Sequence, residues 1–94
     1  MTQLSWLDSS LAAACELSPA QREVLSCLAA GMDIRSTAAV LRRSERMVKA
    51  HTTAILSRLG VCSRLQAGIV GYHLVMQGEL DLPRAAFPRP DSAP

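Results

Sequence analysis

The segment between Ser44 and Val61 holds the side chains of this chain that are best suited to recognising another molecule. Its sequence is SERMVKAHTTAILSRLGV. Mostly apolar residues recur at the spacing of one helix face and would face a core: Val48, Thr52, Ile55, Leu56 and Leu59. The opposite side collects positive and short side chains: Arg46, Lys49, Ala50, Thr53 and Ser57. Such a helix offers hydrogen-bond donors, and its short side chains let the backbone come close to the bases. Reading the major groove of DNA requires both.

A second, short helix is predicted directly before this one. Asp33 can cap it, and it ends near Leu41. Arg42 and Arg43 then leave a turn of very few residues before Ser44 caps the next helix. Two short helices joined this tightly cross at a steep angle, so the sequence predicts a helix-turn-helix arrangement.

Capping boxes predict two further helices. The first begins at Ser18, with Gln21 three positions along, and Gly31 ends it. The second begins at Ser63, with Gln66 in the same role, runs to about Gln77 and stops at Gly78. The helices that pack around the helix-turn-helix therefore come from both sides of it in the sequence.

Basic charge is concentrated in one part of the chain. The net charge is only +2, but residues 34–64 contain seven basic residues and one acidic residue. The basic residues there are Arg35, Arg42, Arg43, Arg46, Lys49, Arg58 and Arg64. Segregated positive charge attracts a polyanion such as DNA, and an ordinary solvated face is the alternative explanation of the charge alone.

The composition predicts a small helical domain. The chain has 94 residues, of which 49% are hydrophobic but only 3% aromatic, so its core must consist of Leu, Val, Ile, Ala and Met. We expect an all-α fold, a four-helix helix-turn-helix bundle over residues 17–78. Residues 1–16 are a leader, either a short extra helix over 8–16 or a frayed segment. The proline-rich residues 79–94 are expected to be a disordered tail.

Other kinds of site find little support in the residues. Cys15, Cys27 and Cys62 are odd in number and far apart, which disfavours disulfides and zinc and fits a reducing cytoplasm. His51 and His73 lack partners at metal-ligand spacing, and no nucleophile or carboxylate pair accompanies His51. No apolar run is long enough to cross a membrane. We therefore expect a cytoplasmic protein with no enzyme activity, no metal and no cofactor.

Residues 17–78 resemble the LuxR/NarL-type (GerE-like) helix-turn-helix domain of bacterial transcription regulators. The matching landmarks are LSPAQREVL from Leu17, Gly31, AxxL from Ala38, RSxxxVKxH from Arg43, ILSRLGV from Ile55, and then Arg64, Gln66 and Ala67. Their order and spacing hold without a gap. Four residues depart from the usual pattern. Met47 stands where the family usually has threonine, Ser36 stands where it has glutamate, and Thr37 and Thr52 stand where it has aliphatic residues.

The resemblance implies a domain whose third helix enters the major groove of double-stranded DNA. Positions that face base edges match Lys49, Ala50 and Thr53, and positions at the phosphate backbone match Ser44, Arg46 and Arg58. The residues themselves leave alternatives, because Lys49 can donate to guanine or to a phosphate, and Ala50 and Thr53 can simply let the helix approach. Arg43 and Arg46, at the start of the helix, would also help its dipole to hold a phosphate.

The resemblance also implies a homodimer joined through the fourth helix. The predicted interface consists of Gly68, Ile69, Tyr72 and Met76. Gly68 and Gly71 would permit close helix approach, either across such a dimer or against the first helix of the bundle within one chain.

Two classes of function remain open. The first is a sequence-specific DNA-binding transcription regulator that reads the major groove with the helix at about 45–59. The alternative is a helix-turn-helix protein-interaction module that modulates another regulator or RNA polymerase. The first needs the basic cluster around Lys49, and the second does not. The few residues before Leu17 leave no room for an input domain and favour a stand-alone protein over a fragment.

Overall fold

The computed structural model describes residues 5–84 and has an all-α fold, as the sequence predicts. The helices are α1 (Ser5–Ala13), α2 (Pro19–Ala29), α3 (Ile34–Leu41), α4 (Glu45–Leu59) and α5 (Arg64–Met76), with a short 3-10 helix, η1 (Ala14–Glu16), after α1. Helices α2 to α5 are the predicted four-helix bundle. The short extra helix at the N-terminus is also present, although it begins at residue 5 rather than at residue 8.

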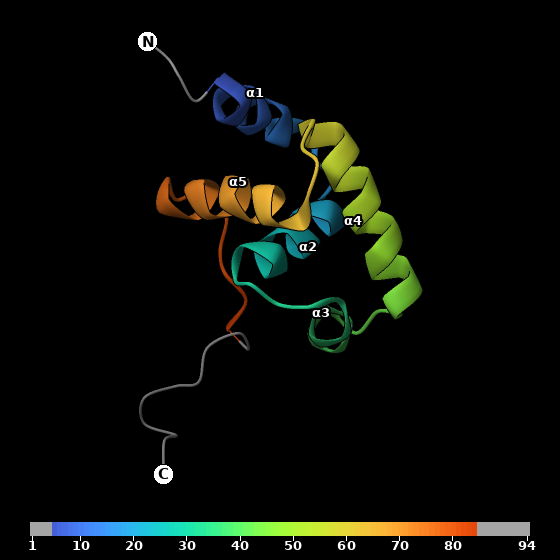
Figure 1. The fold of residues 1–94 in the computed structure, drawn as a ribbon. Helices are drawn as coiled ribbons and strands as arrows, with labels where there is room; N and C mark the ends of the chain where they lie inside the picture. Colours follow the sequence, from blue (N-terminus) through green and yellow to red (C-terminus); the bar gives the residue numbers. More distant parts are fainter. Residues whose placement is uncertain (1–4, 85–94) are drawn as a thin grey trace.

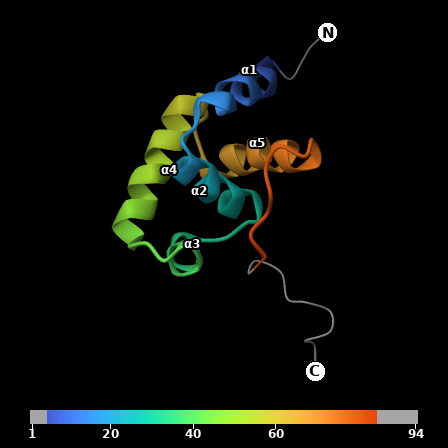
Figure 2. The same ribbon diagram turned by 180° about the vertical axis from the view of Figure 1, so that it is seen from behind.

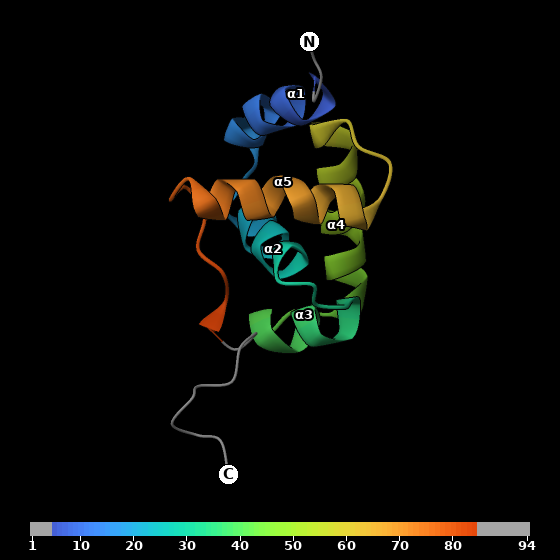
Figure 3. The same cartoon turned by 60° about the vertical axis from the view of Figure 1, so that its left-hand side comes forward.

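Helix α4 forms one edge of the bundle (Figure 1). Helix α5 lies across α2, and these two helices share the most extensive packing in the fold (Figure 3). Helix α3 packs at the N-terminal end of α4, whereas α1 lies beside its C-terminal end (Figures 1 and 2). One side of α4 therefore faces away from the other described helices.

The core is built from short aliphatic side chains that every helix contributes. Its buried members are Leu7, Ala14, Leu17, Val24, Leu25, Ala38, Val48, Ile55, Leu59, Ala67, Val70 and Leu74. Thr52, which stands where an aliphatic residue was expected, is also buried. Its hydroxyl donates to the Val48 carbonyl oxygen one turn earlier at 2.8 Å, so the substitution leaves this buried hydroxyl paired.

The predicted helix starts are confirmed. Each N-cap side chain of α2 to α5 accepts a hydrogen bond from the backbone N–H three residues along, and these N-caps are Ser18, Asp33, Ser44 and Ser63. The box at Ser18 is complete, because its own N–H donates to Gln21 Oε1 at 2.9 Å. The predicted return bond at Ser63 is wrong. Gln66 Oε1 accepts instead from the Cys62 N–H at 2.7 Å, so it satisfies a backbone donor one residue earlier.

Two glycines set the distance between α5 and α2. A Cβ atom added at Gly68 would lie 2.9 Å from the Leu28 carbonyl oxygen, and one added at Gly71 would lie 3.1 Å from the Leu25 carbonyl oxygen. Any side chain at either position would therefore push the two helices apart. Both glycines serve packing within one chain, which is one of the two alternatives that the sequence left open.

The chain continues past α5 along the body of the domain. Arg22 on α2 donates to the Glu79 carbonyl oxygen, and Leu80 packs against the core. The first residues of the predicted tail are thus tied to the bundle. Residues 85–94, which make up most of that tail, lie outside the described residues, as do residues 1–4.

Candidate nucleic-acid interface

The exposed side of α4 carries a continuous set of side chains. Because an α-helix has 3.6 residues per turn, these residues fall within about 100° of arc around the helix axis. All of them are exposed. We call this set the α4 stripe: Arg46, Lys49, Ala50, Thr53 and Ser57.

The opposite side of α4 fixes the direction in which the stripe points. Val48, Ile55 and Leu59 are only 1%, 0% and 3% exposed. Rotating the helix would bring these apolar side chains into water, which is unfavourable in proportion to the apolar area exposed. The core therefore holds the α4 stripe toward solvent. Helix α4 itself lies at the edge of the bundle (Figure 2).

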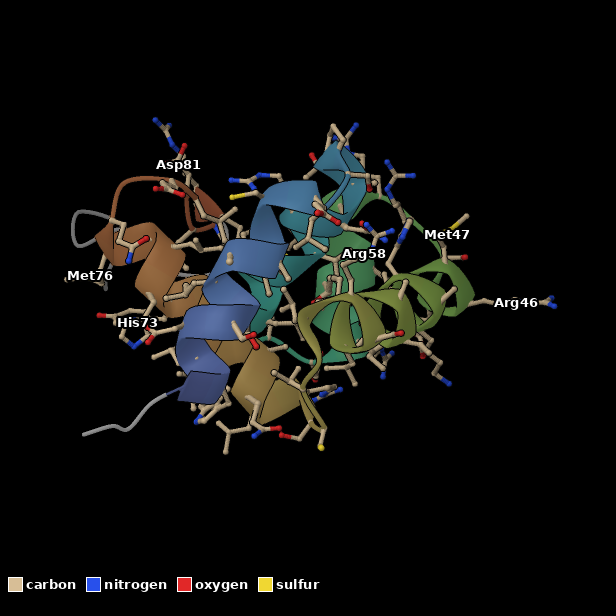
Figure 4. The ribbon with its side chains drawn as sticks, turned by 90° about the horizontal axis from the view of Figure 1, so that it is seen from above. Arg46, Met47, Arg58, His73, Met76 and Asp81 are labelled. Atoms are coloured by element: carbon tan, nitrogen blue, oxygen red, sulfur yellow. The ribbon has the colours of Figure 1, made fainter. Side chains whose placement is uncertain are left out.

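Positive charge gathers at the N-terminal end of α4. Ser44 Oγ accepts the Met47 N–H at 3.1 Å, which leaves the hydroxyl proton free to donate to another group. Arg43, next to Ser44, is exposed. Arg46, in the first turn, extends away from the body of the protein (Figure 4). The two guanidinium groups add to the positive end of the helix dipole, so this end of α4 suits an anion.

Arg58 lies apart from the α4 stripe. It is about 120° around the helix axis from Arg46, and it lies near the other end of α4 (Figure 4). Its guanidinium is 3.5 Å from the Glu16 carboxylate of η1, in the one ion pair found within residues 5–84. The two side chains are 49% and 73% exposed, so the pair contributes little stability and can open. Sequence reasoning missed Glu16, because its partner lies 42 residues further along the chain.

A second exposed surface lies on α5. Four large apolar side chains of this helix reach solvent: Leu65, Ile69, Tyr72 and Met76. Gly68, the other predicted interface residue, is half-buried against α2. Leu65, Ile69 and Tyr72 also line a groove of about 500 Å³. The other wall of this groove includes Leu28 and Met32. No signal in the sequence pointed to that wall, because it comes from the end of α2 and the loop after it.

The cysteines and His51 are the remaining candidate residues. Within residues 5–84, no group of three or more His, Cys, Asp and Glu side chains could hold a metal ion. Cys15 and Cys62 are exposed, whereas Cys27 is buried. Burial raises the pKa of the Cys27 thiol, although hydrogen bonds from neighbouring side chains oppose the shift, so this thiol behaves as a core side chain. His51 is half-buried on α4. No helix in the described part is long and apolar enough to span a membrane.

Comparison with known families agrees with this architecture. Residues 15–70 match the GerE family, the bacterial regulatory proteins of the luxR family. The match covers more than half of the chain, so this chain belongs to the luxR family of bacterial regulatory proteins. The resemblance found in the sequence is thereby confirmed. The matched residues include α2, α3 and α4 but not α1.

One curated relative is similar over 51 residues of the chain. It is the probable HTH-type transcriptional regulator GfsR of Streptomyces halstedii, and the two chains are 42% identical over 51 residues. Those residues are 54% of this chain and 21% of the relative, so the chain spans about a fifth of the relative's length. No solved structure matches the chain.

Proposed function

We propose that this protein is a sequence-specific DNA-binding transcription regulator that reads the major groove of double-stranded DNA with α4. The observation that carries the proposal is the position of the α4 stripe. It is exposed at the edge of the bundle and runs into the basic turn between α3 and α4. A major groove about 12 Å wide admits a helix presented in this way.

Lys49, Ala50 and Thr53 are the residues proposed to face base edges. Lys49 lies one turn after Arg46, and its ammonium group can donate to O6 and N7 of guanine. Ala50 and Thr53 are small, so they let the helix backbone approach the bases. The Ala50 methyl group suits contact with a thymine methyl, and the Thr53 hydroxyl can pair with either a donor or an acceptor.

Four other residues are proposed to contact phosphates: Arg43, Ser44, Arg46 and Arg58. The first three lie at the N-terminal end of α4, and Arg58 lies toward its C-terminal end. Contacts at both ends would bracket the base-edge residues and fix the register of the helix on the duplex, without carrying sequence information themselves. Arg58 would exchange the Glu16 carboxylate for a phosphate.

The salt dependence of binding tests the proposal without knowledge of the operator. The basic residues between Arg35 and Arg64 should release several counterions from DNA. We expect a slope of about −3 to −5 per protomer in a log–log plot of the binding constant against salt concentration. A binding constant that hardly changes between low and moderate salt would contradict a DNA role. A genome-wide footprint of the tagged protein, beside that of its Lys49→Ala variant, would then locate the sites.

The proposed active species on DNA is a homodimer joined through α5. Ile69, Tyr72 and Met76 would supply its contacts, because each is an exposed apolar or aromatic side chain on one helix. Gly68 would support this surface indirectly, by holding α5 close to α2.

A second candidate function is a protein-interaction module that modulates another regulator or RNA polymerase. The apolar surface of α5 favours it, since Leu65 and Met76 are 75% and 69% exposed. In that case the basic residues of α4 would be incidental. Lys49→Ala would then leave regulation unchanged, whereas in a DNA-reading protein the same variant should weaken regulation, because binding to the best site is weaker.

A further inference from the structure

Four helices of this domain end in the same way. At the end of α2, α3, α4 and α5, a residue with positive φ follows, and the next backbone N–H donates to the carbonyl oxygen five residues back at 2.9–3.0 Å. This arrangement is the Schellman motif. The positive-φ residues are Gly31 (79°), Arg42 (57°), Gly60 (71°) and Gly78 (78°). Arg42 is therefore the exception among the four, and it is the one non-glycine residue with positive φ within residues 5–84.

The left-handed conformation is unfavourable for Arg42. A Cβ atom in this conformation lies too close to the following carbonyl oxygen, whereas glycine avoids the contact. Within the described domain, no ion pair of the Arg42 side chain offsets this strain. The Arg42 side chain is exposed and takes part in no ion pair with residues 5–84. The backbone hydrogen bonds of the Schellman motif hold this conformation, but they need no side chain and would form equally well with glycine. An arginine at such a position therefore suggests a use of its side chain outside the chain.

We propose that Arg42 is a further phosphate-binding residue, which extends the DNA-contacting surface from α4 onto the turn between α3 and α4. The inference rests on the proposed function. Arg42 immediately precedes Arg43, and its Cα lies within about 8 Å of the Ser44 Cα, because consecutive Cα atoms are about 3.8 Å apart. The guanidinium is permanently charged, and its fork of N–H donors pairs two at a time with phosphate oxygens. The turn would thus offer two adjacent guanidinium groups to the DNA backbone.

The strain and the charge of Arg42 can be separated by substitution. Arg42→Gly removes both, Arg42→Lys keeps the charge, and Arg35→Gln removes the same charge from the other end of α3. Binding of each variant to a duplex of mixed sequence is measured by fluorescence anisotropy over a range of salt concentrations. A phosphate contact acts on any sequence, so no operator is needed. Thermal unfolding of each variant is recorded alongside.

We expect Arg42→Gly to bind about tenfold more weakly at low salt, with a salt slope shallower by about one. Its unfolding midpoint should equal or exceed that of the wild type, because glycine fits this backbone conformation. Arg42→Lys should keep most of the affinity, and Arg35→Gln should change it by less than about twofold.

Four outcomes would overturn the inference. Wild-type affinity for Arg42→Gly would mean that Arg42 does not contact DNA. An equal loss of affinity for Arg35→Gln would mean that Arg42 contributes only net charge. A lower unfolding midpoint for Arg42→Gly would contradict the strain on which the argument stands. If the wild-type protein itself binds no DNA and Lys49→Ala changes nothing, the proposed function fails as well. If the wild-type protein binds DNA but the Arg42 substitutions do not weaken that binding, only the inference about Arg42 fails and the proposed function stands.

Discussion

The hydroxyl of Ser10 on α1 donates a hydrogen bond of 2.7 Å to the carbonyl oxygen of Leu59 in the last turn of α4. The last four carbonyl groups of a helix have no partner within it, and Leu59 supplies one of them. Ser10 is only 1% exposed, so water does not reach this bond easily. The bond therefore ties α1, which lies outside the family match, to the helix that carries the α4 stripe.

Replacing Ser10 should measurably destabilise the domain. Ser10→Ala leaves the buried Leu59 carbonyl without its partner, which should lower the free energy of unfolding by about 1–3 kcal/mol. Urea unfolding followed by circular dichroism measures this change. Ser9→Ala is the matched control, since Ser9 is exposed on the same helix and should change stability by less than about 0.5 kcal/mol. Equal stabilities for the two variants would mean that the bond is not needed.

The Asp33 cap should make the stability of α3 depend on pH. Its carboxylate accepts the Ser36 N–H at 2.7 Å, and the hydrogen bonds from Ser36 lower the pKa of Asp33 below its ordinary 3.8. A carboxylate whose pKa is lower in the folded state stabilises the protein above its unfolded pKa, and this stabilisation is lost as the pH falls through the folded pKa.

The measurement for Asp33 is the difference in unfolding midpoint between the wild type and Asp33→Ala. We expect a constant difference above about pH 5 and a shrinking one below about pH 4. Asp33→Asn keeps a good N-cap without a titrating group, so it should show no such loss over the same range. A difference that stays the same at every pH would refute this role of the carboxylate.

The proposed dimer should be weak in solution and firm on DNA. So small a domain offers only a small patch on α5, and interfaces well below about 1,200 Å² seldom hold stable dimers alone. Two adjacent half-sites would make the second binding event effectively intramolecular. Tyr72→Glu should therefore abolish cooperative binding to a paired site while leaving binding to a single half-site nearly intact. Sedimentation of free and DNA-bound protein measures the stoichiometry.

The choice of variant for the dimer follows from the packing of α5. A glutamate at Gly68 would meet the Leu28 carbonyl and disturb the fold, so that variant cannot isolate an interface effect. Gln77→Glu adds the same charge just beyond α5, at an exposed position outside the proposed interface, and serves as the control. A complex with one protomer on a two-half-site duplex, at saturating protein, would contradict the dimer.

The sequence predicted the bundle well because its helix signals are local. Each helix start is marked by a capping side chain and the backbone N–H three residues along, and all four caps are present: Ser18, Asp33, Ser44 and Ser63. The periodicity of α4 likewise separated its buried side from its exposed side, as Ile55 and Lys49 show. Features that depend on one helix and its next few residues were therefore accessible from the sequence.

Features that depend on distant segments were not accessible. The Glu16–Arg58 ion pair and the Ser10–Leu59 hydrogen bond join residues more than 40 positions apart, and no local pattern marks either. The left-handed backbone at Arg42 was also missed, since an arginine gives no signal for a conformation that usually belongs to glycine.

The base selectivity of variants at Lys49 and Arg58 tests the central claim most directly. Wild type, Lys49→Ala and Arg58→Ala are each used to select bound duplexes from a random library, and the binding of the selected sequences is then measured. Lys49→Ala should lose about 1–3 kcal/mol on the best site and discriminate less among bases at one position. Arg58→Ala should weaken every sequence by a similar factor and keep the wild-type preference, because a phosphate contact carries no base information. If both variants lose affinity with the same sequence profile, α4 does not read bases through Lys49, and the account is contradicted.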